Sequence, residues 1–265
     1  MAFIFDGRAY AVKKEKELKK TISKLKLEGK IPNLASILIG DSPASRLYVG
    51  LKKKAAQRVG AELDIYFLPE KVKIEEIMLL IDTLNEDSFV KGIMIQLPLP
   101  GSLELHREEI IGAIDPNKDV DGLKKDSKFL HPTSKAVAQI LDEAKNEVEV
   151  KIKKICVVGS TGMVGAPLIK ELKREGYDVV GCNHSTKSLA QETLKADAVI
   201  SATGITNLIK GDMVKGGAVV IDVGSPKGDV DFSEVSKTAS FITPVPGGVG
   251  PMTVTCLLEN LVSAC

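Results

Sequence analysis

The sequence predicts a two-domain α/β protein, and three observations support this class. The chain has 265 residues, enough to form a full hydrophobic core in each of two domains. Short apolar segments alternate with segments of helical period along almost the whole length. A stretch rich in Pro, Gly and Asp ends this alternation near 124–131. Strands that alternate with helices form βαβ units, so each domain should be a doubly wound α/β domain with a parallel sheet.

Seven apolar segments are predicted to be buried strands, because strands of a parallel sheet are covered on both faces and read as continuous apolar runs. In chain order they are Leu34–Ile39, Leu63–Phe67, Gly92–Ile95, Ile155–Val158, Asp178–Gly181, Ala198–Ser201 and Ala218–Val223.

Six segments between these strands have the period of a helix. One of them has Ser42 as a predicted N-cap, proline at its first position and Gly60 at its end. The pattern leaves open to which domain the last helix returns. The predicted helices are Lys13–Leu27, Pro43–Gly60, Ile74–Asn85, Ser134–Asn146, Gly162–Glu175 and Thr253–Val262.

The composition of the chain argues against several classes of function. The chain has 36 basic and 35 acidic residues, so it offers no electrostatic footprint for nucleic acid and no polybasic membrane anchor. No apolar run is long enough to span a bilayer. Four cysteines without a C-x-x-C pair favour a reducing, cytoplasmic location. The three histidines have no metal-ligand spacing, so no metal site is expected.

A glycine-rich turn follows the strand Ile155–Val158 and precedes a predicted helix. Its glycines are Gly159, Gly162 and Gly165. Glycines at such a turn let the backbone approach a pyrophosphate, which the free N–H groups of the helix attract. The spacing differs from G-x-G-x-x-G, so a tight turn in another kind of α/β protein is the alternative. Its place within a βαβ series favours nucleotide binding.

The next strand ends in Gly181-Cys-Asn-His184-Ser185-Thr-Lys187, which contains no acidic residue. Sites selective for NAD usually have an Asp or Glu here for the ribose 2′-hydroxyl. Hydroxyl, imidazole and ammonium groups suit a 2′-phosphate better, which predicts NADP rather than NAD. The alternative is a solvated polar turn.

Tyr48 and Lys52 are four residues apart on a predicted helix and should share one face. Leu47 and Leu51 begin an apolar stripe that continues through Ala55 and Val59, so Lys52 is expected at its edge. A lysine beside an apolar surface has a lowered pKa and can act as a base near neutral pH. The alternative is a pair of surface residues with buried stems.

Three further segments carry polar or conformationally special residues. Gln96 follows the strand Gly92–Ile95, at the edge where open α/β sheets bind ligands. The acidic stretch 115–122 is either a structural Asx turn or a carboxylate presented to a ligand. The Pro- and Gly-rich segment Thr243–Thr253 allows close approach to its backbone, or it forms a structural corner.

Together these segments resemble the bifunctional methylenetetrahydrofolate dehydrogenase/cyclohydrolases over nearly the whole chain. The matching motifs are Tyr48-x-x-x-Lys52, Gln96-Leu-Pro-Leu-Pro, Lys118-Asp-Val-Asp-Gly122 and Thr243-Pro-Val-Pro-Gly-Gly-Val-Gly-Pro-Met-Thr253. The resemblance implies a homodimer of chains in which two α/β domains flank a cleft. The N-terminal α/β/α catalytic domain would comprise 1–127 and 252–265, and the Rossmann-type NADP-binding domain 128–251.

The same resemblance implies two reactions: oxidation of 5,10-methylenetetrahydrofolate with NADP, and hydrolysis of the methenyl product to 10-formyltetrahydrofolate. Lys52 would be the catalytic residue and Gln96 its hydrogen-bonding partner. Tyr48 would stack on the aminobenzoate ring, and Asp121 would bind the pterin. Further substrate residues would be Ser45, Pro246, Gly247 and Gly248, and the cofactor residues Gly159, Ser160, Thr161, Gly162, Gly165, His184, Ser185 and Ser225.

The chain departs from the family pattern at three places. Ser160 stands where the family has an arginine, and Ser225 where it usually has an apolar residue. His131-Pro-Thr-Ser-Lys-Ala136 replaces the family's Pro-Cys-Thr-Pro-x-Gly. These departures are expected on the cofactor side or at the domain junction, and none at Lys52, Gln96 or Asp121.

Two other functions are open. A dehydrogenase similar to shikimate dehydrogenase would have the same two-domain form but leaves the motifs at Gln96 and Thr243 unexplained. A non-catalytic nucleotide- or folate-binding protein would be favoured by loss of Lys52 or Gln96, and both residues are present.

Overall fold

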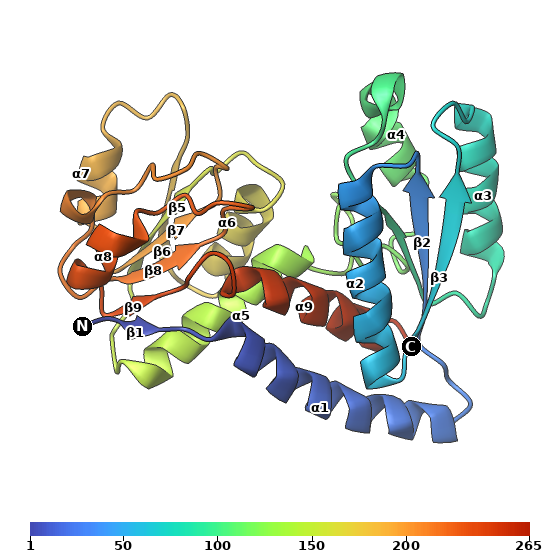
Figure 1. The fold of residues 1–265 in the computed structure, drawn as a ribbon, viewed down its shortest axis with the longest axis horizontal. Coiled ribbons are helices and arrows are strands. Elements are labelled where there is room, and N and C mark those ends of the chain that lie inside the picture. Colours follow the sequence, from blue (N-terminus) through green and yellow to red (C-terminus); the bar gives the residue numbers. More distant parts are fainter. The chain divides into compact units, whose positions relative to one another are not determined.

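The computed structural model describes residues 1–265 and contains two compact α/β units (Figure 1). The first unit combines Met1–Ala11 with Thr133–Thr253, and the second combines Val12–Pro132 with Val254–Cys265. No helix in the structure is both long enough and apolar enough to cross a membrane.

The second unit has a parallel sheet of three strands in the order β3-β2-β4. Its elements are β2 (Asn33–Ile39), α2 (Pro43–Val59), β3 (Glu62–Leu68), α3 (Ile74–Glu86), β4 (Gly92–Ile95), a 3₁₀ turn (Gly101–His106) and α4 (Arg107–Gly112), with most of α1 (Gly7–Leu27) and the end of α9 (Val249–Ser263).

Each face of this sheet has its own core, because successive side chains of a strand point to opposite faces. Ile37 and Ile95 face α3 and pack with Ile77. Leu34 and Met94 face the other way, where α1, α2 and α9 cover the sheet. Gln96 follows Met94 by two residues, so this alternation directs its side chain to the α2 side as well.

The first unit has a six-stranded parallel sheet in the order β1-β9-β8-β7-β5-β6. Because all strands are parallel, their carboxyl ends meet at one edge, where this class of sheet binds ligands. The elements are β1 (Phe3–Ile4), α5 (Pro132–Glu147), β5 (Lys154–Val158), α6 (Gly165–Arg174), β6 (Asp178–Cys182), α7 (Leu189–Leu194), β7 (Ala198–Ser201), a 3₁₀ turn (Gly211–Met213), β8 (Val219–Asp222), α8 (Phe232–Thr238) and β9 (Phe241–Ile242).

All seven predicted strands are present, with ends that differ by at most one residue. All six predicted helices are present too, although α1 and α9 begin earlier and α6 begins at Gly165 rather than Gly162. The elements that the pattern did not predict are the two-residue strands β1 and β9 and the short helices α4, α7 and α8. These are too short to establish a period of 2 or 3.6 residues.

The division of the chain differs from the predicted domains. Its later boundaries fall after Pro132 and Thr253 rather than after residues 127 and 251. The first eleven residues belong to the dinucleotide-type unit, because Phe3–Ile4 pairs with Phe241–Ile242 and extends its sheet. The ring of Phe3 stacks on Phe241 at 5.5 Å. At the other end, Leu258 on α9 packs in the core of the second unit, so the C-terminal helix returns to the unit that contains Lys52.

Candidate active site

Helix α2 is fixed at both ends by local sequence. The hydroxyl of Ser42 accepts a hydrogen bond from the backbone N–H of Ser45 at 3.5 Å, and Pro43 occupies the first turn. Gly60 ends the helix with φ of 89°, a conformation that glycine adopts without strain. These caps determine which face of α2 meets the sheet.

The buried face of α2 overlaps the predicted stripe only in the second half of that stripe. Leu47 is 63% exposed and Leu51 is 47% exposed, so the first half of the prediction is wrong, whereas Ala55 and Val59 are buried. The other buried apolar residues of the helix are Val49 and Ala56. Lys52 follows Val49 by three residues and precedes Ala56 by four, which are spacings of a single helix face. Lys52 therefore lies on the same side of α2 as these residues and is half-buried, as expected at the edge of the covered face.

The amine of Lys52 meets the end of β4. Its Nζ donates a hydrogen bond to Oε1 of Gln96 at 3.0 Å and lies 3.7 Å from Sδ of Met94. The side-chain Nε2 of Gln96 in turn donates to the carbonyl of Leu97 at 2.8 Å, which fixes the orientation of the amide. The structure thus brings together the two residues that the sequence assigned as partners.

Burial lowers the pKa of Lys52 from its ordinary value, and the nearby carboxylate of Asp121 opposes this effect. Desolvation penalises the ammonium form, and a sulfur and an amide oxygen compensate it only in part. A lysine with a lowered pKa can both accept and donate a proton near neutral pH.

Three residues of the stretch before Gly122 hold its backbone in one conformation through hydrogen bonds. Asp115 accepts the backbone N–H of Asn117 at 2.8 Å, which is an Asx turn. The Nζ of Lys118 donates to three backbone carbonyls near the end of α3. Buried Asp119 accepts the N–H of Lys124 at 2.9 Å, while its burial raises its pKa. Asp121 has no hydrogen bond within the chain and faces Lys52 electrostatically. The segment therefore contains both features that the sequence offered as alternatives: an Asx turn, at Asp115, and a carboxylate that a ligand could meet, at Asp121.

His131 belongs to this cluster, contrary to the expectation that the departure at 131 would stay away from Lys52 and Asp121. A Cβ at Gly122 would lie 2.6 Å from the backbone N of His131, so the two segments are in direct contact. Burial lowers the pKa of His131; the Asp121 carboxylate acts to raise it and the Lys52 charge to lower it. No periodicity signals this position, and its only signal is the histidine in place of the family's proline.

Asn260 on α9 ties these two segments together, and sequence reasoning missed it. Its Nδ2 donates to the carbonyl of Val120 and to the carbonyl of Leu130, both at 2.9 Å. These carbonyls directly precede Asp121 and His131. Asn260 is buried, and a polar residue close to the buried Leu257, Leu258 and Leu261 is the signal that could have revealed it.

Tyr48 and Ser45 occupy the same helix as Lys52 but differ in exposure. Tyr48 is 49% exposed, one turn before Lys52, which leaves its ring free to stack on a planar ligand. Ser45 is buried in the first turn of α2.

The glycine turn lies at the carboxyl end of β5. Gly159 has φ of 89°, and a Cβ there would lie 2.3 Å from the carbonyl oxygen of Ala202. A Cβ at Gly165 would lie 2.3 Å from the carbonyl oxygen of Gly159. Gly162 has more room, since its nearest neighbour would be 3.4 Å away. Thr161 lies between these glycines, and the turn leads into α6, whose first amides have no partner within the helix.

The remaining predicted cofactor residues lie at the same edge of this sheet. A Cβ at Gly181 would lie 2.8 Å from Cβ of Ser160, so Ser160 sits at the end of β6. His184 and Ser185 follow this strand in a turn that Asn183 closes, since its Oδ1 accepts the N–H of Ser185 at 2.9 Å. Ser225 follows β8, in a loop with a cis peptide bond to Pro226.

The Pro- and Gly-rich loop before α9 belongs to the first unit. Its Val245–Pro246 peptide bond is cis, and the N–H of Gly248 donates to the carbonyl of Pro244 at 2.8 Å. Gly247 has φ of 112°, a conformation that favours glycine. A Cβ at Gly7 would lie 1.9 Å from the carbonyl oxygen of Gly248, so the backbones approach very closely here.

A pair of buried carboxylates at the ends of β7 and β8 was not predicted. Asp222 accepts the backbone N–H groups of Gly224 and Val230 at 2.8 and 2.9 Å, and burial raises its pKa. Asp229 accepts the hydroxyls of Ser201 and Thr203, both at 2.9 Å. The two acids shape the loop that contains Ser225.

Comparisons with known proteins agree with this arrangement. Residues 5–121 match the model of the tetrahydrofolate dehydrogenase/cyclohydrolase catalytic domain, and 131–265 match that of its NAD(P)-binding domain. The bifunctional protein FolD of Nautilia profundicola is 42% identical over 98% of this chain and 96% of its own.

Solved structures give the same result. The bifunctional FolD of Campylobacter jejuni has a TM-score of 0.94 and 40% identity, covering 100% of this chain and 98% of its own. FolD of Trypanosoma brucei, complexed with NADP and an inhibitor, has a TM-score of 0.90 and 33% identity over 99% and 97%. A shikimate dehydrogenase is 14% identical with a TM-score of 0.54 over 88% and 94%, which shows a shared fold alone.

Proposed function

The chain belongs to the tetrahydrofolate dehydrogenase/cyclohydrolase family, and we propose that the cluster of Lys52, Gln96 and Asp121 serves both of its reactions. These are oxidation of 5,10-methylenetetrahydrofolate to the methenyl form and hydrolysis of that form to 10-formyltetrahydrofolate. The observation that carries the proposal is the 3.0 Å hydrogen bond between Lys52 and Gln96, made at the edge of the covered helix face. A surface lysine with a buried stem would not have this partner or a pKa lowered by burial.

The hydrolytic step is where a protein base is needed. Water adds to the methenyl carbon, and the water oxygen must then lose its protons as the formyl C=O forms. Lys52 accepts a proton in its neutral form and returns one to the ring nitrogen that leaves. Gln96 holds the amine in place through its oxygen, and its own orientation is set by Leu97.

The oxidative step depends on orientation more than on a base, because a ring nitrogen lone pair stabilises the cation that forms. In our proposal, Tyr48 stacks on the aminobenzoate ring and the carboxylate of Asp121 accepts hydrogen bonds from the pterin. The half-exposed ring of Tyr48 and the carboxylate of Asp121, which acts on the Lys52 amine, support these roles. Ser45 and the Pro246-Gly247-Gly248 loop would complete the folate contacts.

NADP is the proposed hydride acceptor, and it supplies the oxidising equivalent when bound. The glycines of the turn support a pyrophosphate site, because any side chain at Gly159 or Gly165 would meet backbone oxygen and the turn leads into the N-terminus of α6. Ser160, His184 and Ser185 gather at the end of β6, where the ribose 2′-substituent lies in this class of fold. Thr161 and Gly162 would follow the pyrophosphate, and Ser225 would approach the cofactor from β8.

The direct test is to mix the purified protein with methylenetetrahydrofolate and either NADP or NAD. We expect nucleotide reduction with NADP above that with NAD, followed by decay of the methenyl absorbance. Absence of turnover with both nucleotides would contradict the proposal. Faster turnover with NAD than with NADP would still support folate as the substrate but would contradict NADP as the preferred cofactor.

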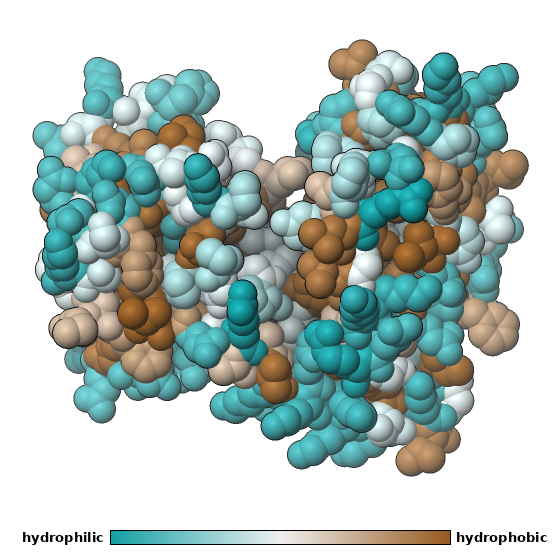
Figure 2. Space-filling view, viewed as in Figure 1, coloured by the Kyte–Doolittle hydropathy of each residue, from teal (hydrophilic) through white to brown (hydrophobic).

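The proposed oligomer is a homodimer that uses the α2–β3 surface, which we define as Leu38, Val49, Gly50, Ile65 and Phe67. Strand β3 is an edge strand, and its Ile65 and Phe67 are 40% and 51% exposed. Figure 2 shows apolar residues gathered over α2 and β3. The surface encloses a cavity of about 380 Å³, and exposed apolar patches on edge strands commonly mark interfaces.

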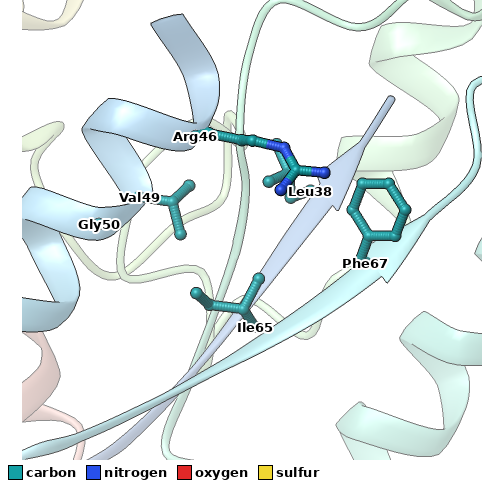
Figure 3. Close-up of a pocket in the computed structure, with 6 residues that line it drawn as sticks. All are labelled: Leu38, Arg46, Val49, Gly50, Ile65 and Phe67. Atoms are coloured by element: carbon teal, nitrogen blue, oxygen red, sulfur yellow. The ribbon is translucent and has the colours of Figure 1, made fainter. Parts of the chain in front are cut away.

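Arg46 borders this cavity and supports a protein partner rather than a lipid or small apolar ligand. Figure 3 shows its side chain reaching from α2 toward Phe67, and its Cζ lies 5.4 Å from the centre of that ring. Asp41 neutralises its charge. We expect Phe67→Glu to convert a dimer to a monomer in light scattering, while Phe89→Glu, at a 77% exposed phenylalanine elsewhere, leaves the dimer intact. A monomeric wild-type protein would remove the dimer from the proposal.

A cytoplasmic location is also proposed. None of the four cysteines is in a disulfide, and Sγ of Cys156 lies 3.6 Å from Sγ of Cys182. Thiols this close persist in a reducing compartment. Fractionation of the source cells tests this: recovery of the protein outside the cytoplasm would contradict it.

A further inference from the structure

Two buried carboxylates, Asp222 and Asp229, lie at the cofactor edge of the six-stranded sheet and have no role in the reactions proposed above. Their exposed fractions are 3% and 0%. The groups that donate hydrogen bonds to their side chains all belong to residues 201–204 and 224–230, at the carboxyl ends of β7 and β8. Burying a carboxylate costs free energy, so this arrangement indicates that the placement of these loops matters.

Asp229 reaches from the loop after β8 to the loop after β7. Its Oδ2 accepts the backbone N–H of Thr203 at 2.6 Å, and the hydroxyls of Thr203 and Ser201, both at 2.9 Å. The N–H of Gly204 lies 3.3 Å from the same oxygen. The hydroxyl of Thr203 in turn accepts the N–H of Ile205 at 3.1 Å. Oδ1 of Asp229 is buried and has no partner, so a single oxygen fixes the loop after β7.

Asp222 holds Asp229 in place and joins it to a third loop. Oδ1 of Asp222 accepts the backbone N–H of Asp229 at 3.0 Å. The backbone N–H of Asp222 donates to the hydroxyl of Thr243, the first residue of the Pro- and Gly-rich loop, at 2.8 Å. A Cβ at Gly228 would lie 2.5 Å from Oδ2 of Asp222, so this packing is close. The loops after β7, β8 and β9 are thus connected through one pair of acids.

The order of the strands indicates which half of a dinucleotide these loops would meet. The glycine turn follows β5, which lies between β6 on one side and β7, β8 and β9 on the other. A dinucleotide lies across the carboxyl ends of such strands with its pyrophosphate at the glycine turn. The ribose 2′-phosphate is proposed at the end of β6. The nicotinamide half would therefore lie on the opposite side, over the loops after β7 and β8.

We propose that Asp229 is a positioning residue for the oxidation, because its Oδ2 holds the loop after β7 where the nicotinamide half of NADP needs it. This inference rests on the proposed function, since it has meaning only if the chain oxidises methylenetetrahydrofolate with NADP. Asp229 touches neither the folate nor the hydride acceptor and acts through the loop. Hydride transfer is sensitive to such placement, since a shift of about 1 Å can lower a rate about 10²-fold.

The test compares Asp229→Ala and Asp229→Asn with the wild type. In Asp229→Ala, kcat of the oxidation should fall and the KM for NADP should rise, which together lower kcat/KM about 10²-fold. Titration calorimetry should show weaker binding of NADP. Asp229→Asn should restore most of both, because its amide oxygen can replace Oδ2 while its nitrogen replaces Oδ1, which has no partner.

Asp231→Ala is the matched control. Asp231 lies two residues after Asp229, and its side chain accepts hydrogen bonds from Ser233 and Lys210, which lie outside the three loops. Its oxidation rate and NADP binding should equal those of the wild type. Thr203→Val keeps the size of Thr203 and removes only its hydroxyl, so it tests the same loop even if Asp229→Ala does not fold. It should lower the oxidation in part.

Hydrolysis of methenyltetrahydrofolate without nucleotide separates positioning from a general loss of structure. It is proposed at the Lys52 cluster of the other unit and uses no NADP, so it should stay close to the wild-type rate in every variant. Oxidation that is unchanged in Thr203→Val would overturn the inference. So would an equal fall of oxidation and hydrolysis, or an Asp229→Asn variant as slow in oxidation as Asp229→Ala. Absence of oxidation by the wild type with either nucleotide would instead contradict the proposed function.

Discussion

The Lys52 cluster and the Gly159 turn use opposite means to prepare a site. Around Lys52, side chains form the site: Lys52 is hydrogen-bonded to Gln96, and Asn260 holds the carbonyl that precedes Asp121. Around Gly159, the site depends on the absence of side chains, because backbone oxygens occupy the space that a Cβ would need. The first kind of site can lose its chemistry and keep its fold, whereas the second kind cannot change without disturbing the fold.

Lys52→Met should give the largest effect and test this contrast most directly. Hydrolysis of the methenyl form should fall by about 10²- to 10⁴-fold, the range for loss of a positioned general base. The free energy of unfolding at neutral pH should rise, because a half-buried amine with a lowered pKa binds fewer protons than in the unfolded chain and so costs stability below its unfolded pKa. Denaturation at several pH values measures this, and the gain should shrink as pH rises. Undiminished hydrolysis would remove Lys52 from its role.

Gly159→Ala should affect the fold before it affects the chemistry. Its φ of 89° and the 2.3 Å approach to the Ala202 oxygen predict a loss of more than about 3 kcal/mol in unfolding free energy. Gly162→Ala is the control, since its Cβ would meet nothing closer than 3.4 Å. Chemical denaturation of both variants makes the comparison. Equal stability of the two would mean that the turn tolerates side chains and that its glycines serve another purpose.

Asn260→Ala should have an intermediate effect. It leaves the buried carbonyls of Val120 and Leu130 without this donor, which predicts a loss of about 1–3 kcal/mol in unfolding free energy. Hydrolysis should fall as well, since these carbonyls adjoin Asp121 and His131. Ser263→Ala, an exposed change on the same helix, should stay within about 0.5 kcal/mol of the wild type. Urea denaturation and the hydrolysis assay measure the two effects. An Asn260→Ala variant that is destabilised yet fully active would mean that α9 does not contribute to the site.

Ser160→Arg should have the smallest effect and sharpen the cofactor side of the comparison. An arginine at the end of β6 could pair with a 2′-phosphate and tighten NADP binding about tenfold, since a hydrogen bond to a charged group contributes about 1.5–3 kcal/mol. Binding of NAD should not change. Ser160→Gln matches the length without the charge, and titration calorimetry measures all three proteins. Equal tightening for NAD and NADP would mean that residue 160 does not approach the 2′-phosphate.

The sequence predicted the elements that have a repeating pattern of apolar residues and missed the features that depend on single residues. The seven longer strands and six longer helices were found because their period is visible, whereas α4, α7 and α8 are too short to show one. Phe3–Ile4 gives no period either, so its place beside Phe241–Ile242 could not be foreseen. The apolar stripe at Leu47 and Leu51 was wrong because hydrophobicity does not say which apolar face of a helix is covered. On α2, Lys52 lies at the edge of the covered face.

The residues of the site divide in the same way into those that the sequence predicted and those that it missed. Lys52 and Gln96 could be paired from motifs because Lys52 lies within the regular helix α2 and Gln96 directly follows the strand β4. His131 could not, because its contact with Gly122 depends on a loop closed by Asn260, 129 positions later in the chain. Long-range hydrogen bonds from single polar residues leave no periodic trace in a sequence.

Neither unit of this protein is a continuous stretch of chain, and this bears on how such proteins can be rearranged. The chain passes from one unit to the other at Ala11, Pro132 and Thr253. A fragment that ends at Pro132 would keep Lys52 and Gln96 but leave Leu34 and Met94 without the cover of α9. The two halves are therefore not interchangeable modules: a chimaera that takes its cofactor half from a relative must exchange two separate segments, Met1–Ala11 and Thr133–Thr253.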